Sequence, residues 1–275
     1  MPLNFDLAGK TYDEQTATIT AEAIEAYAEA SGDANPRYRA DADDQVAPPV
    51  FSVVPGFPLM GGITADPDLG VDNPLMIVHG GQEFVYHRPI RPGDTLVMVP
   101  TLDSVVDKGR NAVYVAKIAF RDIELTPVVD QYWTIVVRGG GSGGERPASG
   151  SEPIERDDVV TSFTRHVDED MPQRYAEASG DHNPIHLDEN TAKMVGLPGV
   201  INHGLGSLSL VAGGLVEHLA DGDPTRLASL GCRFTDMVFP GSDLDTTVWQ
   251  ADDHRAFETT RPDDTAVIVG SVAVD

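Results

Sequence analysis

Two side chains able to exchange protons lie close together in the second half of the chain, within Tyr175–Asp188, YAEASGDHNPIHLD. Asp181 and His186 flank an Asn183-Pro184 turn, so both can face one pocket and hold a water molecule between them. An imidazole that titrates near neutral pH both accepts and donates protons, and such a pair contributes on the order of 10² to 10⁴ in rate. The chemistry that fits is the addition of water to a double bond conjugated to a carbonyl, or the reverse.

Gly204 is placed to stabilise the negative charge that a carbonyl oxygen gathers in such a reaction. It stands at the start of a long apolar segment with helical spacing, where an unpaired backbone N–H and the positive end of the helix dipole face outward. A donor of this kind is worth roughly 10² to 10³ in rate. Asn183 would orient the substrate or the water, or simply form the turn, and His203 would line the pocket or have a structural role.

The chain contains two copies of one unit. Tyr27–Pro36 reads YAEASGDANP and Tyr175–Pro184 reads YAEASGDHNP, with nine of ten positions identical at an offset of 148 residues. The same offset places Gly56 on Gly204. The segment between the copies, GGGSGGERPASGSEP, is too rich in Gly, Ser and Pro to bury a core. We therefore predict a first domain over residues 1–138, a flexible linker over 139–153 and a second domain over 154–275.

The first copy keeps the turn but not the acid/base pair. Asp33 remains, whereas Tyr38 stands where the second copy has His186, and Pro55 stands where it has His203. A phenol with a pKa near 10 is a poor base at neutral pH. We predict that the first copy is catalytically inactive.

Each copy reads as a helix, a loop, a longer helix and then strands. Thr20 caps a helix over 21–30, and Asp170 begins its counterpart, which Gly180 ends. Apolar residues at helical spacing predict a buried helix over 201–219. β-branched and aromatic residues between turn signals predict strands over 83–87, 95–106, 112–122, 128–137, 227–234, 243–251 and 265–274. A buried helix followed by such strands implies an antiparallel sheet wrapped around that helix, an α+β class.

Pro55 and Pro58 fall where the first copy should begin its own long helix. Because proline inside a helix costs ~3 kcal/mol, we expect this helix to be short or broken. A broken helix would leave a cavity for an acyl chain or a bulky substituent.

The stretch YAEASGDHNPIHLD, followed by GLPGVINHG, resembles the signature of the MaoC-like, or type 2, (R)-specific enoyl-CoA hydratases. The first copy resembles the degenerate N-terminal domain of fused MaoC-like dehydratases, through APPVF and HGGQEFVYHRPIRPGDTL. The resemblance implies a double hot-dog fold and reversible syn hydration of a trans-2-enoyl-CoA thioester to the (R)-3-hydroxyacyl thioester. It also implies that Asp181 and His186 are the acid/base pair and that neither a metal nor a redox cofactor takes part. Arg88, Arg91 and Arg110 would bind the phosphates of CoA, or remain solvated surface residues.

Several alternatives remain open. His182 and His186 have a metal-like spacing, but the Asn-Pro between them makes a loop and no HExxH accompanies it. A hot-dog thioesterase would place its carboxylate on the central helix, where only Glu217 is available. A non-catalytic acyl-CoA-binding subunit and an acyl-carrier-protein dehydratase are further candidates. Among CoA substrates, crotonyl-CoA, the branched dicarboxyl mesaconyl-CoA and longer acyl chains all fit the motif.

The charge of the chain limits its partners. A net charge of −25 accompanies four lysines and 44 acidic residues, which disfavours binding to nucleic acid or an anionic membrane. An acidic, lysine-poor surface is typical of proteins from a very salty cytosol, and we predict a halophilic, cytoplasmic protein. No apolar run is long enough to span a bilayer. Because two fused hot-dog units already resemble a dimer, we expect a monomer or a homodimer.

Overall fold

The computed structural model describes residues 2–73, 76–144, 156, 158–251 and 254–275. Its first half contains η1 (Phe5–Leu7), β1 (Gln15–Thr18), α1 (Ala21–Ala30), η2 (Pro36–Tyr38), α2 (Val53–Thr64), β2 (Ile77–Tyr86), β3 (Thr95–Lys108), β4 (Asn111–Arg121) and β5 (Pro127–Val137). Its second half contains β6 (Val159–His166), α3 (Met171–Ser179), η4 (Pro184–His186), α4 (Glu189–Met194), α5 (Gly204–Leu219), η5 (Pro224–Arg226), β7 (Leu227–Phe234), β8 (Asp243–Gln250), β9 (Arg255–Thr260) and β10 (Ala266–Val274).

One antiparallel sheet of ten strands runs through the molecule in the order β1-β3-β4-β5-β2-β7-β10-β9-β8-β6. The equivalent strands β2 and β7 pair with each other at the centre of the sheet. Read outward from this pair, equivalent strands follow in the same order in each half. In this pairing Glu83 lies opposite Gly231, its own equivalent at the 148-residue offset. The two halves are therefore related by a pseudo-twofold axis that crosses the β2–β7 pair.

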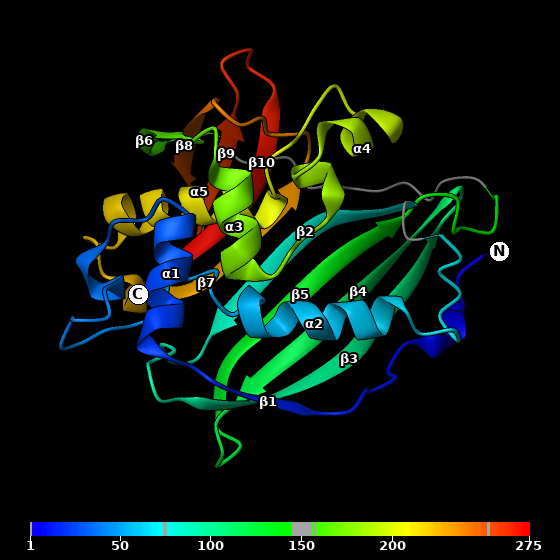
Figure 1. Cartoon of the computed structure of the whole chain (residues 1–275), viewed down its shortest axis with the longest axis horizontal. Helices are drawn as coiled ribbons and strands as arrows, with labels where there is room; N and C mark the ends of the chain where they lie inside the picture. The colour runs from blue at the N-terminus through cyan, green and yellow to red at the C-terminus, as the bar shows by residue number, and fades with distance from the viewer. Residues whose placement is uncertain (1, 74–75, 145–155, 157, 252–253) are drawn as a thin grey trace.

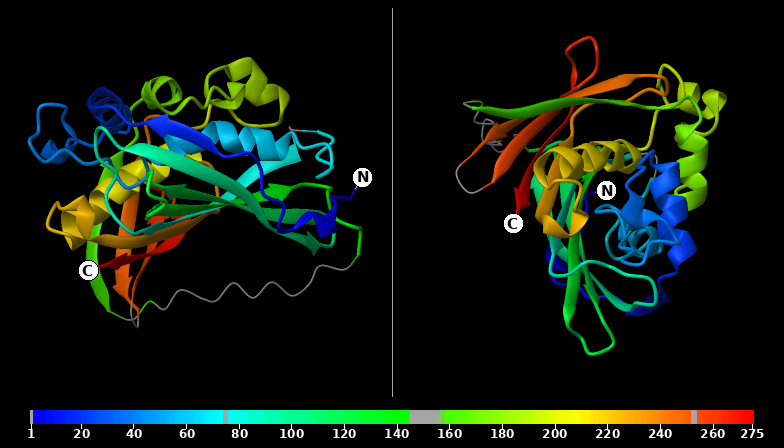
Figure 2. Two further views of the ribbon diagram at one scale, coloured as in Figure 1. Left: turned by 90° about the horizontal axis from the view of Figure 1, so that it is seen from below. Right: turned by 90° about the vertical axis from the view of Figure 1, so that its left-hand side faces the viewer.

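The helices cover one face of this sheet, and the curved strands wrap around them (Figures 1 and 2). α2 packs on β3 and β4 of the first half, whereas α5 packs on β6 of the second. α1 and α3 lie side by side at the axis, where the hydroxyl groups of Tyr27 and Tyr175 are 3.1 Å apart. Each half is thus a sheet curved around one central helix, and the predicted α+β double hot-dog fold is confirmed.

The residues expected to begin and end helices lie at the observed helix ends. The Thr20 hydroxyl accepts a hydrogen bond from the Ala23 amide at 3.1 Å and begins α1. Gly180 ends α3 with a left-handed φ of 79°, a conformation that favours glycine. The buried helix predicted over 201–219 begins at Gly204, and its side chains are buried nearly all round. No helix in the described part of the chain combines the length and apolar character needed to cross a membrane.

The sheet is more extensive than the predicted strands. β1, β6 and β9 were not predicted, and β2 begins at Ile77 rather than near residue 83. The first part of β2, IVHGG, contains two glycines, which weaken a strand pattern. In the structure those glycines lie at a β-bulge between His79 and Gly81.

The first long helix is short, as predicted, but it is not broken. α2 is continuous over 12 residues, shorter than the 16 residues of α5, with Pro58 inside it. Pro55 lies in the first turn, where its missing N–H has no intrahelical partner to lose. Val53, Leu59 and Ile63 are almost fully buried, and this burial offsets the bond that Pro58 removes.

Much of the predicted linker lies outside the described residues, so the domain limits stay predictions. Its first residues, up to Gly144, are described and continue from β5. The Gly141 amide donates to the Arg110 carbonyl at 3.3 Å, and the Gly143 amide donates to the Gly109 carbonyl at 3.0 Å. This part of the segment is therefore hydrogen-bonded to the β3–β4 turn.

Candidate active site

The loop that follows α3 is held by a series of hydrogen bonds from backbone amides to side chains. The Asp181 amide donates to the Ser179 hydroxyl at 3.2 Å, and the Asn183 amide donates to the Asp181 carboxylate at 3.1 Å. The Asn183 side-chain oxygen then accepts from the Ile185 amide at 3.4 Å and begins η4. Short polar side chains that bond to the backbone in this way favour turns over helix. The loop thus fixes Asp181 and His186 at its two ends.

His186 is an uncharged imidazole with one nitrogen left as an acceptor. Its side chain is 7% exposed, and its Nδ1 lies 2.9 Å from the Ile201 carbonyl oxygen. Because a carbonyl only accepts, Nδ1 carries the proton of the neutral ring and Nε2 keeps its lone pair. Burial lowers the pKa of His186, against the raising effects of the Ile201 carbonyl and Asp181. The ring is therefore ready to accept a proton at neutral pH.

His203 packs directly on His186, with ring centroids 3.9 Å apart, and also contacts the ring of Tyr175. Its Nε2 donates to the Asp181 backbone carbonyl at 2.9 Å, so its proton is on Nε2. Its Nδ1 is buried and has no hydrogen-bond partner among the described residues. Burial and the neighbouring His186 lower the pKa of His203 to about 3. His203 is thus a neutral ring that bridges the loop and the start of α5.

The three side chains converge. One potential ligand atom from each of Asp181, His186 and His203 lies within 4.8 Å of the others. A carboxylate and two imidazole nitrogens are donors that a divalent metal such as zinc accepts. The same set, without a metal, is a carboxylate close to two neutral imidazoles. His182, the other histidine of the loop, points elsewhere: it is 54% exposed and lies 3.9 Å from Glu177.

Gly204 begins α5, and no side chain among the described residues caps that end of the helix. Its amide is one of the first N–H groups, which have no acceptor within the helix. A Cβ at Gly204 would lie 3.3 Å from the ring of Phe234, so glycine suits this close packing. His203, which precedes it, links this helix end to the Asp181 loop.

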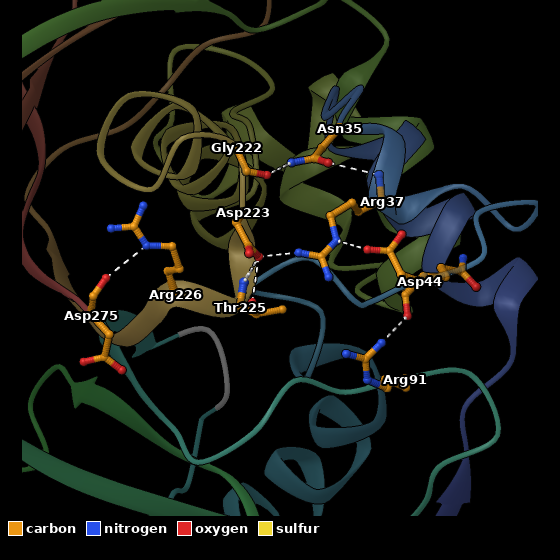
Figure 3. A network of polar contacts seen from close by, with 10 residues as sticks. Asn35, Arg37, Asp44, Arg91, Gly222, Asp223, Thr225, Arg226 and Asp275 are labelled. Atoms are coloured by element: carbon orange, nitrogen blue, oxygen red, sulfur yellow. Dashed lines mark hydrogen bonds and ion pairs between the residues drawn. The ribbon is translucent and has the colours of Figure 1, made fainter.

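The corresponding loop of the first half holds the halves together (Figure 3). The Asn35 side-chain amide donates to the Gly222 carbonyl at 2.8 Å, and Arg37 pairs with both Asp223 and Asp44. Tyr38, the counterpart of His186, is 1% exposed, and burial raises its pKa well above its ordinary value. A buried phenol of this kind does not act as a base. The inactivity of the first half stays a prediction.

The three arginines expected to bind CoA do not share one site. Arg88 pairs with Asp94 at 2.8 Å, and the Arg91 backbone amide donates to the same carboxylate. Arg110 is exposed in the β3–β4 turn. β3 separates the two places with 14 residues, and at about 3.3 Å per residue its ends are roughly 40 Å apart. A role for any of these arginines with CoA stays a prediction.

Sequence reasoning missed His79, which lies near the site but belongs to the first half. Its ring stacks on Trp133 and meets Phe234 edge to face, with centroids 5.0 and 5.1 Å away. Burial lowers the pKa of His79 to about 4, partly offset by nearby groups that include Asp181. The signal in the sequence is HGG over residues 79–81, the first three residues of HGGQEFVYHRPIRPGDTL.

Comparisons with known proteins agree with this architecture. The family described as "MaoC like domain" matches residues 151–270, and the "FAS1-like, dehydratase domain region" matches residues 6–122. The chain is 34% identical to 3-hydroxyacyl-thioester dehydratase Y of Mycobacterium tuberculosis, over 78% of this chain and 74% of that protein. It is 31% identical to probable enoyl-CoA hydratase 2 of Dictyostelium discoideum, over 76% of this chain and 73% of that protein.

A solved structure shares the whole fold. The crystal structure of a MaoC-like dehydratase from Phytophthora capsici superimposes with a TM-score of 0.88 at 25% identity, over 99% of this chain and 98% of that one. Both halves of the chain thus match dehydratase domains, and the arrangement of the halves matches as well. The chain belongs to the MaoC-like family of hydratases and dehydratases.

Proposed function

We propose that the chain reversibly hydrates 2-enoyl-CoA thioesters to (R)-3-hydroxyacyl-CoA thioesters. The observation that carries the proposal is the convergence of Asp181, His186 and His203 within 4.8 Å beside the free end of α5. The relatives named as an enoyl-CoA hydratase and a hydroxyacyl-thioester dehydratase support both directions of the reaction. The (R) configuration follows from the family resemblance.

In the proposed mechanism, one water molecule lies between the Asp181 carboxylate and Nε2 of His186. His186 accepts a proton from this water as its oxygen bonds to the β-carbon of the substrate. The electrons of the double bond move toward the thioester carbonyl, whose oxygen gains negative charge beside the Gly204 amide. The proton then passes to the α-carbon from the same side, so water adds syn and the ring returns to its neutral state. Asp181 holds the water and stabilises the charged imidazole while it exists.

His203 is proposed as a positioning residue. It holds the Asp181 backbone through a 2.9 Å hydrogen bond and packs on the ring of His186. Because burial keeps it neutral, it adds no positive charge beside the base. Asn183 shapes the loop in the same way, through its bond to the Ile185 amide.

The test follows the loss of enoyl-thioester absorbance with crotonyl-CoA and mesaconyl-CoA, in the presence and absence of EDTA. Asp181→Asn and His186→Ala should each lower kcat by on the order of 10² to 10⁴. The first removes the carboxylate that holds the water and stabilises the charged imidazole, and the second removes the base. The matched control is Asp33→Asn, at the equivalent position of the first half, which should keep activity near that of the wild type. EDTA should change nothing, since we propose that neither a metal nor a redox cofactor is required.

Other results would redirect the proposal. Turnover that survives in both variants would remove Asp181 and His186 from the chemistry. No turnover of any CoA thioester, with binding retained, would favour an acyl-binding subunit, and turnover of carrier-protein thioesters alone would favour an acyl-carrier-protein dehydratase. The thioesterase alternative has little support, because Glu217 is 60% exposed and paired with Arg165 at the surface.

The partners and the setting of the protein are proposals of the same kind. The net charge of −25 disfavours nucleic acid and an anionic membrane as partners, and salt at about 1 M screens this repulsion. The acyl-CoA thioester is proposed from the relatives. A cytoplasmic location, adaptation to salt and a monomeric or homodimeric state stay predictions that rest on charge and on the fused fold.

A further inference from the structure

A row of four rings leads from the proposed oxyanion site into the first half. We call the row, formed by Phe234, His79, Trp133 and Phe57, the aromatic barrier. Phe234 lies against Gly204, and the ring of His79 meets Phe234 edge to face at 5.1 Å. Trp133 stacks on the other side of His79 at 5.0 Å, and Phe57 of α2 lies 6.3 Å from Trp133. The barrier thus crosses from one half of the molecule to the other.

The barrier is fixed from behind by a chain of hydrogen bonds. His79 Nε2 lies 3.1 Å from the Gln82 side-chain oxygen, and the Gln82 amide donates to the Gln131 oxygen at 3.4 Å. The Gln131 amide donates in turn to the Ser52 carbonyl at 3.2 Å, next to the start of α2. Gln82 and Gln131 are almost fully buried. Because each amide is paired on both sides, the ring of His79 has little freedom to turn.

In the first half, side chains pack closely at the position that corresponds to Gly204. A Cβ added at Gly56, the counterpart of Gly204, would collide with the side-chain amide of Gln131. α2 continues unbroken above it, as described. An acyl chain that reached past the aromatic barrier would therefore meet packed side chains rather than the cavity that a broken helix would leave.

The four rings of the barrier differ in exposure. Phe57, His79 and Phe234 are only partly buried, whereas Trp133 behind them is 2% exposed. At neutral pH none of the four rings carries a charge, since burial keeps His79 neutral. An acyl group bound at Gly204 would therefore face a rigid wall of uncharged rings. Such a wall suits a short hydrocarbon tail and offers no cation to a second carboxylate.

We propose that the aromatic barrier ends the acyl-binding space, so that the enzyme accepts short, uncharged enoyl groups such as crotonyl and excludes long chains and dicarboxyl groups. This inference rests on the proposed hydratase function. It gives a role in substrate selection to the half that we predict to be catalytically inactive. Three of the four rings come from the first half, and they would determine which thioesters the second half can convert.

The test compares kcat/KM for crotonyl-CoA, 2-octenoyl-CoA and 2-dodecenoyl-CoA. The wild type should lose activity steeply with chain length, because a pocket without room rejects a single extra methylene by roughly tenfold or more. His79→Ala and Phe57→Ala remove partly exposed rings and should raise the ratio of dodecenoyl to crotonyl activity by roughly tenfold or more. Trp249→Ala is the control, because Trp249 lies on β8 against Arg156, away from the barrier, and should leave the ratio unchanged.

Binding of butyryl-CoA and dodecanoyl-CoA, measured by calorimetry, gives a reading that needs no chemistry. We expect the wild type to bind the short thioester more tightly, and His79→Ala to reduce that preference. Equal use of dodecenoyl-CoA and crotonyl-CoA by the wild type would overturn the inference. A short-chain preference that both variants retain would overturn the role of these rings. If the protein converts no enoyl-CoA but still binds butyryl-CoA more tightly than dodecanoyl-CoA, the hydratase proposal fails. The inference that the aromatic barrier limits the acyl chain is then retained.

Discussion

The two buried histidines of the site illustrate how burial prepares a base. His186 and His203 lie in contact and both lose affinity for protons, because a charged imidazole is poorly solvated there. Their tautomers are set by backbone carbonyls, of Ile201 for one ring and of Asp181 for the other. A pair of stacked imidazoles can share such a site only while at most one of them is charged. The arrangement therefore allows His186 to take a proton while His203 stays neutral.

This arrangement makes the stability of the fold depend on pH. The pKa of His203 is lowered to about 3 in the folded state, so between that value and its ordinary range near 6.5 the unfolded state binds more protons. Stability is therefore fully present above about pH 6.5 and is lost as the pH falls, by roughly 1.4 kcal/mol per pH unit. In His203→Gln the free energy of unfolding, measured with urea from pH 7 to 5, should fall less steeply.

The control for this measurement is His182→Gln, because His182 is 54% exposed and meets water in both the folded and the unfolded state. That variant should follow the slope of the wild type. If His203→Gln also follows it, protonation of His203 does not limit the acid stability of the fold.

At the residue scale, the sequence identified Asp181, His186 and Gly204 because a short motif and one helix start place them. It did not identify His79. The position of that ring depends on a β-bulge and on pairing between β2 and β5, whose residues are distant in sequence. The burial of Trp133 and the place of Phe234 depend on the same long-range pairing, which local periodicity does not record.

Helix α2 shows how packing outweighs local preference at the scale of an element. Its sequence, VVPGFPLMGGIT, contains two prolines and three glycines and has a weak helical signal. The structure forms the helix because its apolar residues are covered by β3 and β4. The α5 counterpart was predicted more accurately, because eleven of its residues are buried and its apolar pattern extends over four turns of sequence. Its glycines serve close packing rather than flexibility.

Substituting glycines in the two central helices should have opposite effects. A Cβ at Gly214 in α5 would collide with the ring of Phe163, whereas a Cβ at Gly61 in α2 would have no described atom within 4 Å. Gly214→Ala should therefore lower the free energy of unfolding by about 1 to 3 kcal/mol. Gly61→Ala should raise it by up to about 1 kcal/mol, because alanine favours the helix and restricts the unfolded chain. Urea denaturation measures both, and a stabilised Gly214→Ala would show that Phe163 can move aside.

For the molecule as a whole, acidic side chains far outnumber basic ones, so they repel one another. A net charge of −25 on 275 residues opposes the compact state until salt screens it. The Debye length falls from about 10 Å at 0.1 M salt to about 3 Å at 1 M. The surface ion pairs of the few cations, such as Lys193 with Glu189, offset little of this repulsion, since exposed pairs are worth up to about 1 kcal/mol.

The melting temperature should therefore rise with salt. We expect Tm, followed by circular dichroism at pH 7.5, to increase from 0.05 M to 1 M KCl by roughly 5 to 10 °C, which corresponds to about 2 to 3 kcal/mol for a chain of this size. The same series at pH 5, where protonation begins to reduce the net charge, is the control and should give a smaller increase. A Tm that is constant or falls with KCl at pH 7.5 would count against adaptation to high salt.

The repeat made the twofold organisation of the fold predictable, because nine identical residues in ten set a single offset. The order of the strands was not predictable in the same way. That β2 and β7 meet at the centre, with Glu83 opposite Gly231, depends on contacts across the whole chain rather than on any local pattern.

The β2–β7 pair also has an evolutionary consequence. In an assembly of two identical subunits joined at such a seam, one gene encodes both sites, so a substitution that strengthens the contact by removing a catalytic residue disables both of them. Joining the two units in one chain removes this restriction. The loop with Arg37 and Tyr38 could then change so that Arg37 pairs with Asp223, while the equivalent loop of the second half kept Asp181 and His186. Selection could thus act on one unit for strength and on the other for chemistry, a division of labour that a symmetric dimer does not permit.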